Sequence, residues 1–471
     1  MNSADRLVIV SNRLPVSLRE AAEGGFRLRP ASGGLVTALD PILKRNRGLW
    51  IGWPGFSGGT DPVPLIDEYN RTHTTTLLPV ELTPEEIELY YEGFANGAIW
   101  PLFHDLLSMA RFDAGEWATY DAVNERFAEA VARSRRSRDF TWVHDYHLMR
   151  VAHHLRARRV RGQLHYFHHI PFPSADLFRR LPWHHDLLKG LLDYDLLGFQ
   201  ALRDRRNFIA TVREHYPGVQ FTRKRRYTLI HMGKRTVRVG NYPISIDFGD
   251  FDRTARGEAV ERETRAMRNA YPAEQLILGL DRLDYTKGIP HRFLAFERLL
   301  ETHPEWRGKV SLLQVVVPSR TEVPRYIELK EELDSLTGRI NGRFSDHGYI
   351  PIYYYFKHLT RTELLAHYRA CSVALITPLR DGMNLVAKEY AASRIDLDGV
   401  LVLSEFTGSA DQLGHGALMV NPYDLEGTAE TIHHALTLPR AEREARMRSM
   451  RSQVRQNDVY RWVGWFMEAR G

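Results

Sequence analysis

Cysteine is nearly absent from this chain of 471 residues, because Cys371 is the only one. A single cysteine excludes an intramolecular disulfide, so nothing in the sequence favours an oxidising compartment. Long apolar runs are also missing: the run at residues 7–10 is too short for the core of a signal peptide, and no stretch approaches a membrane span. We therefore expect a cytoplasmic protein without a membrane partner, and we interpret Cys371 as a core residue.

Lysine is scarce as well, because only nine of the 64 basic residues are lysines and arginine supplies the rest. The net charge of +6, the pI near 9.2 and basic clusters at residues 133–138 and 223–226 raise the hypothesis of nucleic-acid binding. However, acidic residues are interspersed along nearly the whole chain, and no helix-turn-helix, zinc-finger or RNA-binding signature occurs. We interpret the arginines as solvated faces with some anion sites, and we expect no nucleic-acid partner.

Internal repeats, coiled-coil heptads and low-complexity linkers are absent too. With 43% hydrophobic residues the chain can bury large cores, and its length suggests two or three domains. Short apolar runs alternate with amphipathic segments, which is typical of α/β proteins whose parallel sheets are covered by helices. The predicted strands include residues 7–10, 141–143, 164–167, 276–280, 310–317, 373–376 and 400–403.

The segment at residues 241–247 is the expected domain boundary, because a charged helical segment and a fresh strand follow it. This predicts an N-terminal domain over residues 1–245 and a C-terminal domain over residues 246–455. A last helix, within residues 456–471, is expected to pack back on the first domain. Elsewhere, Thr83 with a proline and acids after it predicts the start of a helix that runs to about Phe94.

The most informative motif is the stretch PLRDGMNLVAKEY at residues 378–390, which follows a predicted buried strand. Gly382 permits a tight turn, so the unpaired N–H groups of the following helix can face a phosphate. Glu389 lies one turn beyond Leu385, where its carboxylate could accept hydrogen bonds from two ribose hydroxyls. Asp381 on the turn could bind sugar hydroxyls.

A second motif, DRLDYTKG at residues 281–288, follows the strand at residues 276–280. Arg282 and Lys287 offer two cations, which match the two charges of a diphosphate. Structural readings stay open, since Arg282 could be a salt-bridge partner, Asp381 an N-cap and Glu389 a solvent-facing acid. Their joint occurrence favours a ligand site, and the missing G-x-G-x-x-G after the first strand argues against a dehydrogenase.

Paired histidines at residues 153–154, 168–169 and 184–185, together with His144 and His147, could be zinc ligands. No cysteine or clear acidic ligand set accompanies them, so structural or sugar-binding roles are favoured and no metal site is expected. Trp50 and Trp53 would lie on opposite faces of a strand, and core and site roles are equally open for them.

In this order and spacing, the motifs resemble the trehalose-6-phosphate synthases, and the resemblance runs nearly end to end. The family consists of retaining glycosyltransferases with the GT-B fold, in which two Rossmann-like domains with parallel sheets face each other across an active-site cleft. The elements that carry the resemblance are residues 10–15, 33–35, 50–53, 90–101, 144–147, 168–173, 282–288, 339–343 and 378–390.

The resemblance implies a donor site for a nucleotide-glucose, in which Arg282 and Lys287 bind the diphosphate and Glu389 the ribose. The other donor residues that it implies are Gly34, His169, Asp381, Met383, Asn384 and Leu385. For the acceptor, glucose 6-phosphate, it implies that Arg13, Tyr91, Trp100 and Arg320 surround the phosphate and that Asp145 binds the sugar. It implies catalytic roles for Asp145, His169, Arg282, Lys287 and Asp381, and no essential metal or cofactor.

These implied roles agree with simple electrostatics, because a phosphate dianion favours arginine forks and tyrosine adds a further hydrogen bond. If Arg13 comes from the first domain and Arg320 from the second, acceptor binding would be coupled to domain closure. Retention by double displacement would need a carboxylate nucleophile, which the sequence does not reveal. The alternative is front-face attack, in which the departing β-phosphate oxygen accepts the acceptor's proton.

Several points stay open at this stage. UDP-glucose or GDP-glucose is expected as the donor and ADP-glucose is conceivable, since Leu359 stands where some relatives carry an aromatic residue. Residues 17–31, with Arg19, Arg27 and Arg29, suggest a mobile cover over the acceptor. The alternatives to a trehalose-6-phosphate synthase are a glucosylglycerol-phosphate synthase and a non-catalytic sugar-phosphate sensor. The oligomeric state is open, a homo-oligomer included.

Overall fold

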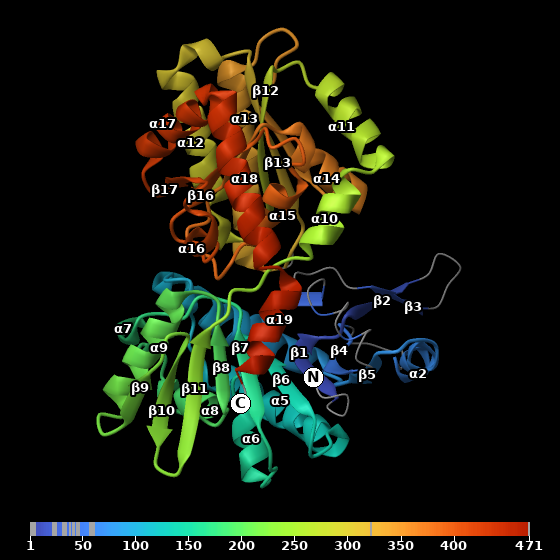
Figure 1. The fold of residues 1–471 in the computed structure, drawn as a ribbon, viewed down its shortest axis with the longest axis vertical. Helices are drawn as coiled ribbons and strands as arrows, with labels where there is room; N and C mark the ends of the chain where they lie inside the picture. Colours follow the sequence, from blue (N-terminus) through green and yellow to red (C-terminus); the bar gives the residue numbers. More distant parts are fainter. Residues whose placement is uncertain are drawn as a thin grey trace. The chain divides into compact units, whose positions relative to one another are not determined.

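The computed structural model describes residues 6–20, 26–30, 35–36, 39, 43, 48–55, 62–320 and 323–469. The chain divides into two units (Figure 1): unit 1 comprises Met1–Pro243 and Val463–Gly471, and unit 2 comprises Ile244–Trp462. Within the described residues, no helix combines the length and apolarity needed to cross a membrane. Each unit is built on its own sheet, which is mainly parallel in unit 1 and wholly parallel in unit 2.

Unit 1 has a nine-stranded sheet in the order β5-β4-β1-β6-β7-β8-β11-β10-β9. Its first six strands form the Rossmann order 3-2-1-4-5-6, and β10 pairs antiparallel with both of its neighbours. A separate antiparallel pair is formed by β2 (Val16–Glu20) and β3 (Phe26–Pro30). The sheet strands are β1 (Leu7–Arg13), β4 (Leu49–Trp53), β5 (Thr76–Pro79), β6 (Phe140–His144), β7 (Leu164–His168), β8 (Leu196–Phe199), β9 (Gln220–Arg223), β10 (Tyr227–Met232) and β11 (Arg235–Asn241).

Helices of unit 1 connect these strands. They are α2 (Val63–Thr72), α3 (Pro84–Glu86), the π-helix η1 (Ile87–Ile99), α4 (Trp100–Phe103), η2 (Leu107–Met109), α5 (Ala114–Ser134), η3 (Tyr146–Leu148), α6 (Val151–Ala157), α7 (Ala175–Phe178), α8 (His184–Leu192) and α9 (Leu202–His215). The predicted start at Thr83 is confirmed, because its side chain accepts from the backbone N–H of Glu86 and the Glu86 carboxylate accepts from that of Thr83. The predicted end near Phe94 is wrong, since helical backbone continues with i→i+5 hydrogen bonds to Ile99 and then through α4.

Unit 2 has a six-stranded, wholly parallel sheet in the order β14-β13-β12-β15-β16-β17, which is again 3-2-1-4-5-6. Its strands are β12 (Gln275–Arg282), β13 (Val310–Val317), β14 (Ile352–Phe356), β15 (Val373–Ile376), β16 (Val400–Ser404) and β17 (Leu418–Val420). The apolar runs predicted as strands in both units are confirmed, because strands that are buried on both faces of a sheet consist largely of hydrophobic residues.

Helices cover both faces of the second sheet (Figure 1). One face packs against α10 (Phe248–Ala255), α11 (Glu258–Ala270), α14 (Arg361–Ala370), α15 (Leu385–Ser393) and α18 (Arg440–Gln456). The other packs against α12 (Ile289–Thr302), α13 (Pro324–Phe344) and α17 (Leu425–Thr437). Shorter helices are η4 (Tyr285–Lys287), η5 (Pro304–Trp306) and α16 (Ala410–Leu413). Cys371 is fully buried in the first of these cores, as expected.

The last helix, α19 (Val459–Glu468), starts in unit 2 and ends in unit 1. Asp458 caps its start, because the Asp458 carboxylate accepts from the backbone N–H of Arg461. Further along, Phe466 is fully buried and stacks on Trp142 of β6, with 4.3 Å between ring centroids. Residues at the end of the described chain therefore complete the core of unit 1.

Candidate active site

Both sheets have a topological switch point, where neighbouring parallel strands send their connections to opposite faces and leave a crevice at their carboxyl ends. In unit 2 this point lies between β12 and β15, which are neighbours in the sheet. Arg282 ends β12, and Asp381 lies in the turn after β15. In unit 1 the point lies between β1, which Arg13 ends, and β6, which Asp145 follows. The predicted site residues thus cluster where ligands of such sheets bind.

The segment after β12 in unit 2 gathers positive charge around Asp284. The Asp284 carboxylate is buried and accepts hydrogen bonds from the backbone N–H and the hydroxyl of Thr286, at 3.0 and 2.8 Å. Burial alone would raise its pKa, but the charges of Lys287, Arg320 and Arg282 outweigh burial and lower the pKa. These three predicted site residues therefore lie near one carboxylate, which sequence reasoning had not singled out.

Arg282 and Arg320 differ in how they are held. Arg282 is exposed, and its side chain has neither a hydrogen-bond nor an ion-pair partner among the described residues. Arg320 has positive φ (51°) and donates to the hydroxyl of buried Tyr326, at 2.5 Å. Behind them, Arg292 of α12 forms a fully buried ion pair with Asp281, which fixes the end of β12. A buried ion pair thus fixes the strand end that presents Arg282.

The turn after β15 in unit 2 is held by a network centred on Asp381. Lys287 Nζ lies 2.5 Å from Asp381 Oδ2, and Asn384 Nδ2 donates to the same oxygen at 3.1 Å. Asn384 has left-handed backbone (φ 65°) and caps α15, because its Oδ1 accepts from the N–H of Ala387. By helix geometry the N–H groups of Leu385 and Val386 have no intrahelical acceptor. The positive end of α15 therefore stands beside the Lys287–Asp381 pair.

A loop after β16 supports this turn from behind, and sequence reasoning missed it. The Thr407 hydroxyl and the Ser409 N–H both donate to the carbonyl of Met383, at 2.8 and 2.9 Å. Gly408 N–H donates to the carbonyl of Asp381, and a Cβ on Gly408 would meet the Gly382 oxygen at 2.0 Å. Only a glycine permits so close an approach, which is the one signal in the sequence that could have pointed to this loop.

Two further residues of α15, Glu389 and Lys388, differ in burial and in their hydrogen-bond partners. Glu389 is partly exposed, and its carboxylate accepts from the Tyr368 hydroxyl at 2.6 Å. Burial of the carboxylate raises its pKa, and the hydrogen bond from Tyr368 and the charge of Arg361 offset this rise only in part. Lys388 is buried, and its ammonium donates to the carbonyl of Ile244 at 2.6 Å, while burial lowers its pKa to about 7. Lys388 therefore fastens the segment at the start of unit 2.

Unit 1 places Arg13 against aromatic rings. Its guanidinium carbon lies 4.0 Å from the ring centroid of Trp53 and 5.7 Å from that of Tyr91. Trp53 is buried and thus serves both the core and this cation–π contact, whereas Trp50 is a core residue whose indole N–H donates to Ser11. Tyr91 also stacks on His147, at 5.7 Å.

Trp100 lies near the same group through a shared neighbour. It is 6% exposed and its ring lies 5.6 Å from that of Tyr146. The Tyr146 hydroxyl donates to Asn96, whose amide donates in turn to the carbonyl of Tyr91. The π-helix η1 carries both Tyr91 and Asn96, so its unusual winding sets how these side chains meet.

Asp145 and His169 are brought together after β6 and β7 of unit 1. Asp145 has positive φ (74°), and its Oδ1 accepts from the backbone N–H of His169 at 3.1 Å. Such backbone strain in a residue other than glycine or asparagine is typical of functional sites. The His169 ring is held at both nitrogens: Gln200 Nε2 lies 3.2 Å from Nδ1, and His144 Nδ1 lies 3.0 Å from Nε2.

The imidazoles around His169 are neutral at neutral pH. Burial lowers the pKa of His169 to about 3, with a further contribution from His168, whose own pKa burial lowers to about 3. Burial also lowers the pKa of His144, with His169 as the second cause. A neutral His169 that accepts from Gln200 carries its proton on Nε2.

The remaining predictions from the sequence concern Gly34, the expected cover, the paired histidines and Leu359. Gly34 lies outside the described residues, as do residues 21–25 and 31 of the expected cover at residues 17–31. The other residues of that segment belong to β2 and β3. Of the paired histidines, His184 and His185 lie with His215 at distances suited to a metal ion, whereas the other pairs form no such group among the residues described. Leu359, near the expected nucleobase pocket, is partly buried against the core of unit 2.

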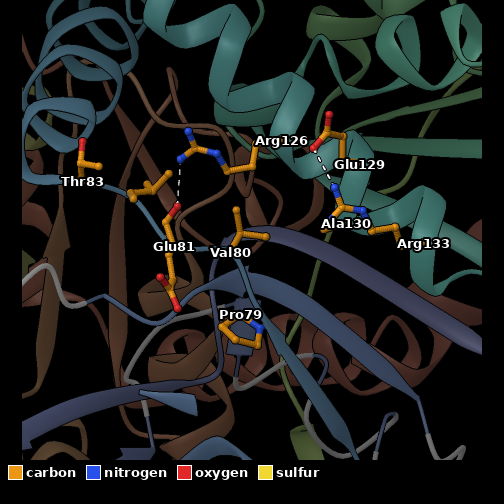
Figure 2. Close-up of a pocket in the computed structure, with 9 residues that line it drawn as sticks. Pro79, Val80, Glu81, Thr83, Arg126, Glu129, Ala130 and Arg133 are labelled. Carbon is orange, nitrogen blue, oxygen red and sulfur yellow. Dashed lines mark hydrogen bonds and ion pairs between the residues drawn. The ribbon is translucent and has the colours of Figure 1, made fainter. Parts of the chain in front are cut away.

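A cavity of about 520 Å³ opens elsewhere on unit 1, between the end of β5 and α5 (Figure 2). Figure 2 shows Arg126 directed at the carbonyl of Glu81, and Arg133 at Glu129. Arg126 also forms a two-bond ion pair with Glu86. The positive groups of this cavity are thus neutralised by acids, and none of the predicted site residues lines it.

Comparison with known proteins agrees with this geometry. The family model of glycosyltransferase family 20 matches residues 5–469. Trehalose-6-phosphate synthase of Mycobacterium marinum is 42% identical over 98% of this chain and 93% of its own length, and that of Mycobacterium tuberculosis is 41% identical over 98% and 94%.

Solved structures give the same result. An α,α-trehalose-phosphate synthase (UDP-forming) from Burkholderia xenovorans, in complex with glucose-6-phosphate, is 37% identical, covers 99% of each chain and has a TM-score of 0.89. The E. coli protein bound with UDP-2-fluoro glucose is 35% identical over 99% of each chain, with a TM-score of 0.87. The expected GT-B fold is therefore confirmed. The chain belongs to glycosyltransferase family 20.

Proposed function

We propose that the chain transfers glucose, with retention of the α configuration, from a nucleotide-glucose to glucose 6-phosphate, which forms trehalose 6-phosphate and a nucleoside diphosphate. Family membership and the names of the relatives support the reaction. The solved relatives support both substrates, since one is described with glucose-6-phosphate and another with UDP-2-fluoro glucose.

The observation that carries the proposal is the convergence of charge in unit 2. Arg282, Lys287 and Arg320 surround Asp284, and the positive end of α15 stands beside Lys287 and Asp381. Such a set of cations and N–H groups at a switch point suits a diphosphate. Arg282 and Lys287 are proposed to bind the donor diphosphate, with backbone groups of Met383, Asn384 and Leu385, and Glu389 to bind the ribose. Gly34 is proposed as a further donor residue.

The network around Asp381 suggests how binding and chemistry are linked. Asp381 Oδ2 already accepts from Lys287 and Asn384, which makes this carboxylate a poor nucleophile. An arriving diphosphate would compete for Lys287 and release Asp381 to accept hydroxyls of the transferred glucose. Front-face attack then needs no protein nucleophile: the leaving phosphate oxygen takes the acceptor's proton, and Arg282, Lys287 and the start of α15 stabilise the growing negative charge.

Unit 1 supplies the proposed groups for the acceptor. A guanidinium stacked on an aromatic face, as in Arg13, keeps its N–H groups in a plane suited to a phosphate. Arg13, Tyr91 and Trp100 are therefore proposed as phosphate-binding residues, together with Arg320 of unit 2. Asp145 is proposed to bind acceptor hydroxyls and His169 glucose hydroxyls, in line with their strained and tightly held geometry.

UDP-glucose is the proposed donor, in preference to GDP-glucose and ADP-glucose. The support is the UDP-forming activity in the names of similar solved structures. The test is to incubate the purified chain with glucose 6-phosphate and each nucleotide-glucose in turn, to measure nucleotide release, and to identify the disaccharide phosphate. We expect fastest turnover with UDP-glucose.

Each other outcome of this assay has a definite meaning. Faster turnover with GDP-glucose or ADP-glucose contradicts the nucleotide assignment alone. Release that does not depend on glucose 6-phosphate contradicts the acceptor assignment, and the same assay with glycerol 3-phosphate in its place then tests for a glucosylglycerol-phosphate synthase. Absence of release with every donor, while glucose 6-phosphate still binds, identifies a sugar-phosphate sensor.

A further inference from the structure

Three histidines of unit 1 meet at a place that the proposed reaction does not use. His184 and His185 begin α8, and His215 ends α9. One ligand nitrogen from each lies within 4.8 Å of the others, and His184 Nδ1 is 2.7 Å from His215 Nε2. Imidazole nitrogens at such spacing are the ligands that zinc and similar divalent ions prefer.

The hydrogen bonds of His215 define which nitrogen it offers. Its Nδ1 lies 2.8 Å from the carbonyl of Thr211, which can only accept, so Nδ1 carries the proton. Nε2 therefore presents its lone pair toward His184. This arrangement, with one ring nitrogen bound to a carbonyl and the other directed at a metal, is the usual support of a metal-ligating histidine.

The charged side chains near His184 partly cancel. Arg179 is the nearby cation, and Glu214 lies 3.7 Å from it and partly neutralises it, while Asp186 adds a negative charge. A bound cation would displace the proton that His184 and His215 share.

A second group with suitable distances, His303, Glu305 and His433 of unit 2, is worse arranged. The indole N–H of Trp306 donates to His433 Nδ1 at 3.0 Å and so occupies that nitrogen's lone pair. Both nitrogens of His303 face carboxylates, those of Glu305 and Glu430, at 3.3 and 3.0 Å. Here the imidazoles already serve protein partners, which leaves the first group as the better ligand set.

We propose that His184, His185 and His215 form a site for one divalent transition-metal ion of the zinc type. Three imidazoles leave the fourth tetrahedral position for water or a small anion. The ion would join the start of α8 to the end of α9, and it would stabilise unit 1 by its binding free energy. None of the three residues belongs to the proposed substrate sites, so the ion serves the fold and takes no part in glucose transfer.

The test uses the full chain without an affinity tag, stripped with a chelator and titrated with Co²⁺, whose visible absorption reports tetrahedral nitrogen ligands. We expect one strongly bound Co²⁺ that Zn²⁺ displaces. His215→Gln and His185→Gln should each weaken binding at least about tenfold, because even second-shell changes cost this much at metal sites. His433→Gln is the matched control and should bind as the wild type does.

Thermal unfolding with and without Zn²⁺ separates binding from misfolding. Zn²⁺ should raise the Tm of the wild type and of His433→Gln, but not that of His185→Gln, in which an exposed side chain changes and folding is preserved. Turnover should be the same with and without the ion. Binding that is unchanged in His185→Gln and His215→Gln, binding lost in His433→Gln instead, or no bound Co²⁺ at all would each overturn the proposal.

Discussion

At the scale of single residues, the most consequential contact of unit 2 is the one between Lys287 and Asp381. Both side chains are only 13% exposed, and Asn384 holds the same carboxylate oxygen. A partly buried charge pair of this kind is expected to be coupled, so the effects of substitutions on its members should not add.

Removal of either donor cation should abolish most of the activity and leave the fold intact. We expect Lys287→Ala and Arg282→Ala to lower kcat about 100-fold or more, because each removes a charge that is proposed to stabilise the leaving diphosphate. Steady-state kinetics measures the loss, and circular dichroism checks the fold. Lys309→Ala, at an exposed lysine of unit 2, is the control. Near wild-type kinetics in both variants would exclude these residues as diphosphate ligands.

Asn384 allows backbone strain to be separated from its hydrogen bonds. Its φ of 65° costs alanine about 1 kcal/mol or more but costs glycine little. Asn384→Gly should therefore be more stable than Asn384→Ala, by chemical denaturation, while both lose the bond to Asp381 and fall in kcat. Equal stability of the two variants would show that they do not keep the left-handed backbone. A wild-type kcat in Asn384→Gly would show that the side-chain amide is dispensable.

At the scale of elements, the loop at residues 406–409 positions the turn before α15. Gly408→Ala would place a methyl group against the backbone of Gly382, so we expect both lower stability and lower kcat. Gly338→Ala is the matched control, because it lies within α13 and a Cβ there meets nothing within 4 Å. The control should gain about 0.5–1 kcal/mol, since alanine favours helix over glycine. A kcat unchanged in Gly408→Ala would argue against a positioning role for the loop.

Elements buried on both sides were the ones that sequence patterns revealed best. Residues 373–376 are a continuous apolar run and coincide with β15, and residues 310–317 are a mainly apolar run that coincides with β13. The π-helix at residues 87–99 was missed, because its i→i+5 hydrogen bonds depend on packing and leave no distinct pattern of residues. The hairpin of β10 and β11 is partly exposed and mixed in polarity, and it was not predicted for that reason.

The sequence predicted the residues proposed to contact the substrates, but it did not predict the residues that hold them in place. Asp381 and Arg282 stand in short motifs with local chemical meaning, and the structure sets them at a switch point. Gln200 and Thr407 come from distant segments and act through tertiary contacts with His169 and Met383. His215 was missed for the same reason, because its partners His184 and His185 lie on another helix. The sequence shows those two as an adjacent pair and does not show that His215 lies beside them.

At the scale of the whole molecule, neutral buried histidines should make stability depend on pH. The pKa of His168 and of His169 is about 3 in the folded chain and about 6.5 when unfolded. Between these pH values the unfolded chain binds protons that the folded chain does not bind, so the free energy of unfolding falls as the pH drops. Above about pH 6.5 the two histidines no longer change the stability. Each should contribute up to about 1.4 kcal/mol per pH unit.

Urea unfolding at pH 7, 6 and 5 measures this dependence. His168→Gln removes one of the groups and should make stability less sensitive to pH, whatever it costs at pH 7. The surface variant His347→Gln is the control, because His347 is exposed. A dependence as steep in His168→Gln as in the wild type would mean that His168 does not stay neutral in the folded chain.

The return of the chain to unit 1 should matter for its stability. Phe466 is fully buried and stacks on Trp142, so Phe466→Ala should cost about 3–5 kcal/mol. Phe356→Ala, at a ring that is 36% exposed, should cost much less. Thermal unfolding of the two variants compares them, and equal losses would contradict a core role for Phe466.

The same return has a consequence for biosynthesis. Unit 1 begins with the first strand of the chain, yet its aromatic core is filled by a ring that the ribosome adds only after all of unit 2 has been made. Nascent domains usually fold in the order of their synthesis. Here unit 1 cannot complete its core during its own synthesis, and the surface around Trp142 stays uncovered until α19 has been synthesised.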